Sequence, residues 1–132
     1  MALTDIQEAA ILQYVFGRVS FTPPPLWFAG LSSTEITEAG TGATEPGIGN
    51  YARVAIPNST VGFTYSGNQI TNGTQIQFPT ATISWGQLNY LFFSDLASGG
   101  SIYARGSLSP SQTIGVNQRL FLDPGDLLLT LD

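Results

Sequence analysis

The spacing of apolar residues predicts one helix, at residues 4–16 (TDIQEAAILQYVF). Thr4 is a suitable N-cap, Gln7 completes a capping box with it, and Gly17 follows as a C′ residue. One apolar stripe is made by Ile6, Ala10 and Tyr14. Further apolar side chains surround the second half of the helix: Ile11, Leu12, Val15 and Phe16. A helix that is apolar on all sides is normally covered on more than one side. We therefore expect a neighbouring subunit to provide the second cover.

After the helix, the segment FTPPPL at residues 21–26 marks a change of pattern. Its three consecutive prolines exclude a helix and favour an extended connector. Beyond it, apolar residues alternate with polar ones in short runs separated by Gly, Pro, Asn, Asp and Ser. The strands expected from these runs are 26–33, 51–56, 60–65, 75–78, 80–84, 89–94, 101–107, 112–115, 119–122 and 126–131.

Two of these strands carry clear facial patterns. Leu127, Leu129 and Leu131 fall on one face of the last strand by the two-residue repeat. The run NYLFFSDL at residues 89–96 is apolar at consecutive positions, as expected of a strand covered on both faces. Many short strands with a single helix predict a mainly β fold, an antiparallel β-sandwich of jelly-roll type. The expected organisation is an N-terminal helix and extended arm at 1–25, followed by the sandwich domain at 26–132.

A glycine-rich stretch, EAGTGATEPGIGN, lies in the long loop before residue 51. A phosphate-binding loop needs a lysine and a following helix, and this stretch leads directly into an expected strand. Its glycines therefore indicate turns with positive φ angles, at Gly40, Gly42, Gly47 and Gly49. Loops of this length are usually functional or become ordered against a partner.

Acidic residues are the remaining candidates for chemistry. Carboxylate pairs serve glycosidases and calcium sites, and the loop holds Glu35, Glu38 and Glu45. However, the DPGD sequence around Asp123 and Asp126 is typical of a tight turn, and exposed loop glutamates are typical of a solvated surface. We expect no catalytic residue, no metal and no cofactor.

Arginine and aromatic residues leave two alternatives open. Arg53 is expected either to pair with a loop glutamate or to reach across an interface, where a desolvated pair would set register. Trp27 and Trp85, with neighbouring rings, are expected in the core, with a sugar-stacking surface as the alternative.

Composition narrows the possible functions. The chain has 132 residues, no cysteine, no histidine and a net charge of −5. These features exclude thiol and histidine chemistry and oppose binding to nucleic acid or to an anionic membrane. Only 10% of residues are charged and 42% are hydrophobic, against about 25% charged in average domains. We therefore expect other subunits to cover part of the surface, the alternative being a monomer with an uncharged polar surface. The chain is expected not to be an enzyme.

The order of several motifs resembles a family of small structural proteins of tailed bacteriophages, including viruses of cyanobacteria. The resemblance covers nearly the whole chain. Its most specific part is the sequence TEPGIGNYARV at residues 44–54. The other specific motifs are FP at 78–79 with SWG at 84–86, FSD at 93–95 with SGG at 98–100 in one hairpin, and the closing LTLD.

The resemblance implies a virion structural protein of jelly-roll type, often labelled a tail fibre protein. A cement, or decoration, protein on the outer capsid surface is the favoured function, made in the host cytoplasm and bridging capsomers of the major capsid protein. A homo-oligomer is expected, with a trimer favoured over a dimer. A tail fibre or host-recognition protein is the alternative, and a glycan hydrolase a third. The expected interface residues are Ile6, Ile11, Leu12, Val15, Phe16, Pro23, Pro24 and Arg53.

Overall fold

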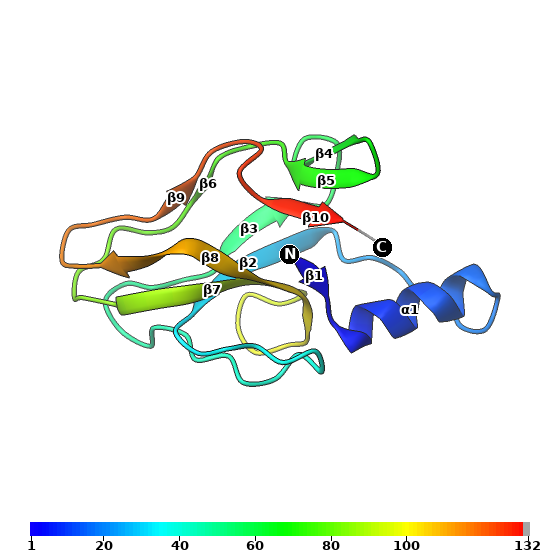
Figure 1. Ribbon diagram of the computed structural model, residues 1–132, viewed down its shortest axis with the longest axis horizontal. Coiled ribbons are helices and arrows are strands. Elements are labelled where there is room, and N and C mark those ends of the chain that lie inside the picture. The colour runs from blue at the N-terminus through cyan, green and yellow to red at the C-terminus, as the bar shows by residue number, and fades with distance from the viewer. Residues whose placement is uncertain (131–132) are drawn as a thin grey trace.

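The computed structural model describes residues 1–130, which form three antiparallel sheets and one helix (Figure 1). The main sheet has the strand order β1-β8-β7-β2-β3. These strands are β1 (Ala2–Leu3), β8 (Ile102–Ile114), β7 (Gly86–Ser94), β2 (Leu26–Ser32) and β3 (Val54–Pro57). Helix α1 (Asp5–Val15) connects β1 to the arm that precedes β2.

Two smaller sheets pack against the main one. The order β10-β5-β4 is formed by β10 (Leu128–Thr130), β5 (Gln69–Asn72) and β4 (Phe63–Ser66), and β6 (Ile76–Gln77) pairs with β9 (Phe121–Leu122). The predicted class is thus confirmed: a mainly β, antiparallel sandwich with a helix at its N-terminal end. The jelly-roll form of that sandwich stays a prediction.

Several strand boundaries differ from those expected. Residues 101–107 and 112–115 were expected as separate strands, but most of this region forms the single strand β8. The strand expected at 80–84 is wrong, because its backbone bonds to loops: the Ala81 amide donates to the Gln118 carbonyl at 2.9 Å, and the Thr82 amide to the Gly49 carbonyl at 3.0 Å. The sequence also did not predict β1 and β5.

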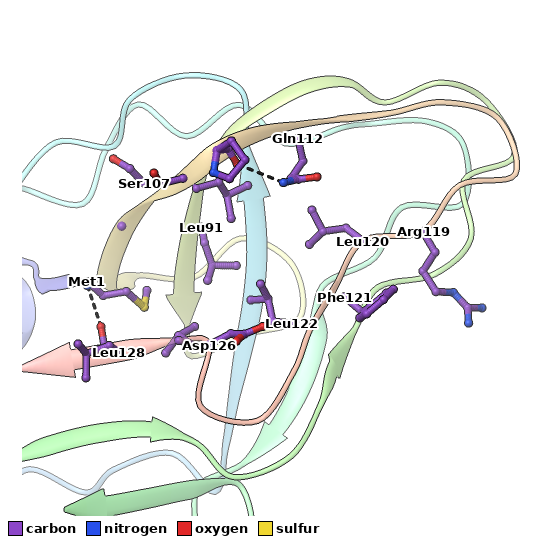
Figure 2. Close-up of a pocket in the computed structure, with 15 residues that line it drawn as sticks. Met1, Leu91, Ser107, Gln112, Arg119, Leu120, Phe121, Leu122, Asp126 and Leu128 are labelled. Atoms are coloured by element: carbon purple, nitrogen blue, oxygen red, sulfur yellow. Dashed lines mark hydrogen bonds between the residues drawn. The ribbon is translucent and has the colours of Figure 1, made fainter.

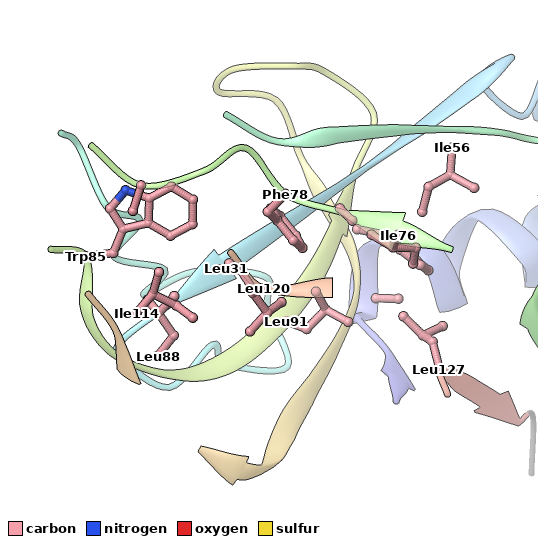
Figure 3. Packing of buried hydrophobic residues seen from close by; sticks show 14 residues of the cluster. Leu31, Ile56, Ile76, Phe78, Trp85, Leu88, Leu91, Ile114, Leu120 and Leu127 are labelled. Carbon is pink, nitrogen blue, oxygen red and sulfur yellow. The ribbon is translucent and has the colours of Figure 1, made fainter. Parts of the chain in front are cut away.

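The main core lies between the sheets (Figure 3). It extends from Trp85, Leu88 and Ile114 at one end to Ile76 and Leu127 at the other. Fully buried aliphatic and aromatic side chains of this kind contribute about 1.5–3 kcal/mol each to stability. The sequence therefore builds its stability mainly from strand residues that meet across the sandwich.

Strand β7 is buried on both faces, as its consecutive apolar residues predicted. Leu91 and Phe93 face the main core, whereas Phe92 packs with Ile36 and Ile102 on the opposite face. The loop before β3 supplies Ile36 and so covers that second face. This explains why the long glycine-rich loop is ordered within the chain itself.

Helix α1 projects from this body (Figure 1). The accessible surface is 7361 Å², against roughly 6,700 Å² expected for a compact monomer of this mass. In Figure 1, α1 leaves the sandwich beside β1, and its C-terminal end points away from the sheets. The accessible surface in excess of that of a compact monomer therefore fits a helix α1 that packs incompletely against the rest of the single chain.

Candidate functional site

The acidic residues do not converge on one site. Glu35 and Glu38 are exposed, and no group of three or more Asp, Glu, His or Cys residues suited to a metal occurs among residues 1–130. Asp123 and Asp126 form the predicted turn, in which the Asp123 amide donates to Asp126 Oδ2 at 2.9 Å and Gly125 has a φ of 88°. These carboxylates therefore have structural roles or face solvent.

Glu45 instead belongs to a partly buried cluster with Arg53 and Tyr51. Arg53 Nε and Nη2 donate to the two Glu45 carboxylate oxygens at 2.9 and 2.8 Å, and the Tyr51 hydroxyl donates to Glu45 Oε1 at 2.7 Å. Arg53 Nη1 also donates to the carbonyls of Leu96 and Gly99. The guanidinium lies 5.1 Å from the centre of a phenylalanine ring on β7. One arginine, just before β3, therefore joins the glycine-rich loop to the loop between β7 and β8.

The cluster shifts the pKa values of its members. Burial raises the pKa of Glu45, but the hydrogen bonds from Arg53 and Tyr51 and the arginine charge outweigh it, so that this pKa lies below its ordinary value. The Glu45 hydrogen bond raises the pKa of Arg53 against the opposing effect of burial. Burial, followed by the hydrogen bond to Glu45, raises the pKa of the Tyr51 phenol. All three groups are thereby held in the protonation states that bind one another.

We expect Glu45→Gln to change how stability depends on pH. A depressed carboxyl pKa adds stability above the unfolded-state pKa, near 4.5, and that stability is lost as the pH falls through the lower folded-state pKa. The variant should thus be less stable at pH 7 by about 1–2 kcal/mol, and the difference from the parent should shrink in acid. Urea unfolding at several pH values measures this. Glu35→Gln, an exposed change in the same loop, is the control, and an equal pH profile for both variants would contradict the assignment.

The glycine predictions are largely confirmed. Gly40, Gly42 and Gly49 have φ angles of 79°, 93° and 70°. Gly47 is the exception, because its φ is not positive, and Asn50 takes a φ of 67° instead. The prediction is therefore wrong for Gly47 alone, and the positive φ of Asn50 was not predicted. No helix follows these glycines before the next strand, so they shape the loop.

Helix α1 ends as predicted but begins differently. At its end, the Arg18 amide donates to the Gln13 carbonyl at 2.7 Å and the Gly17 amide to the Tyr14 carbonyl at 3.2 Å, with a Gly17 φ of 69°. This is a Schellman motif. The capping box is wrong: the Thr4 side chain makes no cap bond, because its buried hydroxyl donates to the Ile102 carbonyl of β8 at 2.7 Å. Thr4 thus anchors the helix to the sheet.

No residue of α1 is buried. Beyond its first turns the helix leaves the sheet, and its end carries five exposed apolar side chains that we call the helix tip. These are Leu12, Tyr14, Val15, Phe16 and Val19, which are 59%, 60%, 63%, 74% and 56% exposed. Exposed apolar side chains of this size at one end of a helix are typical of surfaces at which proteins bind one another.

The residues expected at an interface differ in their position and exposure in the structure. Leu12, Val15 and Phe16 lie in the helix tip, and Ile11 is half-buried. Ile6 is 37% exposed and lies near Gly40 of the loop. The structure places Arg53 in the partly buried cluster, with a side chain only 7% exposed. Of the two alternatives for Arg53, the structure shows the pairing with a loop glutamate.

The prolines of the arm lie at the surface. Pro23 is exposed, and Pro24 is half-buried. The Pro24 carbonyl accepts a hydrogen bond from Asn58 Nδ2 at 2.9 Å, and the Pro25 carbonyl accepts one from the Asn58 amide at 3.0 Å. The arm is therefore fixed against the chain that follows β3.

A pocket of about 210 Å³, which we call the aromatic pocket, opens beside the first turns of α1. Its walls include two aromatic pairs: Trp27 and Tyr103, with ring centres 5.1 Å apart, and Phe63 and Phe93, at 5.8 Å. Gln7 also lines the pocket, and its buried Oε1 has no hydrogen-bond partner. No charged side chain contributes to the walls. This site is suited to an apolar ring that carries one polar atom.

A larger groove of about 690 Å³ lies between β8 and the chain around β9 (Figure 2). Met1 and Leu128 lie at one end, where the Met1 ammonium donates to the Leu128 carbonyl at 2.8 Å. Arg119 and Phe121 lie at the other end (Figure 2). Ser107, Ser109 and Asp126 also line the groove, and within residues 1–130 the Asp126 carboxylate bonds to the Asp123 amide and not to either serine.

The aromatic pocket was missed at the sequence level. Trp27 was interpreted as a core or sugar-stacking residue, and Gln7 as a capping residue. The pocket forms because β1, β2, β8 and β10 meet beside α1, and these elements are distant in the sequence. No local motif signals such a meeting.

The sequence of the chain was compared with curated proteins and with models of protein families. A search of curated proteins finds no match to the chain. No helix within residues 1–130 has the length and apolar content needed to span a membrane. The family model described as Podophage GP4 fiber I protein gp80 matches residues 2–130. The chain therefore belongs to this family of bacteriophage structural proteins.

Proposed function

We propose that the chain is a structural subunit of a virion fibre, fixed to other polypeptides through its helix tip. The observation that carries this proposal is the exposed apolar end of α1, which has no cover in the single chain. The fibre description of the family, which spans residues 2–130, supports the tail-associated location. A tail fibre protein was the alternative to capsid cement in the interpretation of the sequence.

The proposed role is structural and needs no turnover. A carboxylate that forms two hydrogen bonds to Arg53, as Glu45 does, is committed to holding the loop. A low charge content and an uncharged aromatic pocket favour contacts with protein over contacts with nucleic acid. The subunit would be made in the host cytoplasm and become part of the particle during assembly.

Capsid cement remains a second candidate for one reason. The described chain is a compact sandwich with one projecting helix and has no extended shaft. Such a body suits a protein that bridges neighbouring capsomers of the major capsid protein. Repeated small contacts of this kind would add up to substantial stabilisation of a shell.

Fractionation of purified particles distinguishes the two candidates. We expect the chain to remain with tails when heads and tails are separated, as detected with an antibody against the chain. The matched control is the major capsid protein, which should stay with heads. Recovery of the chain with heads, together with binding of the purified chain to expanded empty shells and a higher shell rupture temperature, would contradict the fibre role in favour of cement.

A further inference from the structure

Two surfaces of this chain complement each other but cannot meet within one copy. The helix tip is apolar and projects from the body. The aromatic pocket lies beside the first turns of the same helix, at Gln7. The tip begins about 8 Å further along the helix axis and extends away from the pocket. A rigid helix therefore prevents the tip from folding back into its own pocket.

The chemistry of the pocket matches a side chain in the tip. Buried amide oxygens normally have a hydrogen-bond donor, and Gln7 Oε1 has none. Tyr14 in the tip supplies a ring for the aromatic walls and a hydroxyl for the Gln7 amide. A tyrosine hydroxyl both donates and accepts, so it pairs with either end of that amide. Edge contacts with the existing ring pairs would add further stabilisation.

The charges next to the two surfaces are also complementary. Arg18 follows the turn after α1, and Asp5 and Glu8 lie exposed in the first turns of the helix, which also carry the pocket residue Gln7. Within residues 1–130 none of these three side chains forms an ion pair. Arg18 follows the turn at the C-terminal end of the helix, whereas Asp5 and Glu8 lie near its N-terminal end. A tip inserted from another copy would place its Arg18 beside these acids.

The available area is sufficient for a specific contact. The five side chains of the tip expose roughly 600 Å² together, so covering them would bury about 1,200 Å² when both partners are counted. This value lies at the lower end of the range for stable interfaces. A reciprocal contact between two copies would double it.

We propose that the helix tip of one copy inserts into the aromatic pocket of another copy, with Tyr14 bound at Gln7 and Arg18 beside Asp5 and Glu8. The proposal rests on the assembling role proposed above and names the partner of that contact. Made reciprocally, the contact gives a two-fold pair, and made head to tail, it gives a ring or a filament. The trimer expected from the sequence is one such ring.

Light scattering of the purified full-length chain across a concentration series tests the proposal. We expect an oligomer at about 100 µM, and Tyr14→Ala or Phe16→Gln should weaken association at least tenfold. Both side chains are exposed, so these variants should keep the parent's circular dichroism. Val61→Gln changes an equally exposed apolar residue, 64% exposed and outside both surfaces, and should leave association unchanged.

A charge exchange tests the predicted geometry. Arg18→Glu should weaken association, and the double variant Arg18→Glu with Glu8→Arg should restore much of it, because each copy then carries both reversed charges. A merely structural role for either residue would not give this rescue. Failure of the double variant to recover would overturn the proposed placement of Arg18.

Engineered cysteines provide a direct test because the chain has none of its own. A copy with Tyr14→Cys mixed with a copy with Asn58→Cys, at the pocket wall, should form a mixed disulfide under mild oxidation. Ile48→Cys in place of Tyr14→Cys is the control and should not. A monomer at every concentration, or an oligomer without this disulfide, would overturn the proposal. A monomer that fractionates with tails would overturn it while leaving the fibre role intact.

Discussion

Replacing Arg53 by methionine is expected to lower the free energy of unfolding by about 3 kcal/mol, measured by urea denaturation. The change removes both bonds to Glu45 and the bonds from Nη1 to the carbonyls of Leu96 and Gly99. The Gly99 carbonyl keeps a second donor, the Ser94 hydroxyl. It also leaves the Glu45 carboxylate, 27% exposed, without its counter-charge. Methionine retains much of the volume beside Phe92, so the loss would report mainly the polar cluster.

Arg119→Met is the matched control for this experiment. Arg119 is exposed and forms no ion pair among residues 1–130, so its replacement should change stability by less than about 0.5 kcal/mol. Combining Arg53→Met with Glu45→Gln should cost less than the sum of the single changes, because the two residues act on one another. Additive losses, or equal effects of the two arginine variants, would contradict the role assigned to the cluster.

Gly30→Ala is expected to destabilise the fold by about 2–3 kcal/mol. Gly30 lies in β2 opposite Phe92 of β7, and a Cβ there would overlap the Phe92 ring. Both residues are buried, and the ring packs between the main sheet and the loop residue Ile36. The ring therefore has little room to move away. Thermal and urea unfolding of the variant measure the loss.

A second substitution identifies the cause of that loss. Phe92→Leu removes the far end of the ring, so Gly30→Ala should cost clearly less in this background than in the parent. Gly47→Ala is the control, because a Cβ at Gly47 meets no atom within 4 Å and the φ angle there is not positive. A large loss at Gly47, or no relief from Phe92→Leu, would show that steric overlap is not the reason.

Local signals predicted the helix well. Gly17 correctly indicated the C-terminal turn, and cover of the apolar second half by another subunit stays a prediction. The N-terminus was harder, because Thr4 fits a capping box as well as any threonine. Its hydroxyl instead meets the Ile102 carbonyl, a contact between residues far apart in the sequence. Tertiary hydrogen bonding can override a local motif in this way.

The strands illustrate the same limit. Consecutive apolar residues correctly indicated that β7 is buried on both faces. Strand β5 had a local signal that was overlooked: Gly67 and Asn68 both take positive φ, 58° and 63°, as in a type I′ hairpin turn between β4 and β5. Residues 80–84 alternated like a strand but lack a neighbouring strand to pair with. Pairing partners are set by the whole fold.

The candidate site depended most on long-range structure. The pairing of Arg53 with a loop glutamate was anticipated, but the choice of Glu45 required the loop to turn at Gly40, Gly42 and Gly49. The aromatic pocket had no signal in the sequence. Trp27 and Tyr103 come from strands that are separated by most of the chain. Only their meeting beside α1 creates the site.

An electron cryomicroscopy map of the intact particle tests the central claim most directly. The account predicts density for this chain within a tail fibre, with Leu12, Val15 and Phe16 of α1 covered by another polypeptide. A map in which the chain lies on the capsid surface, or in which the end of α1 faces open solvent, would contradict it.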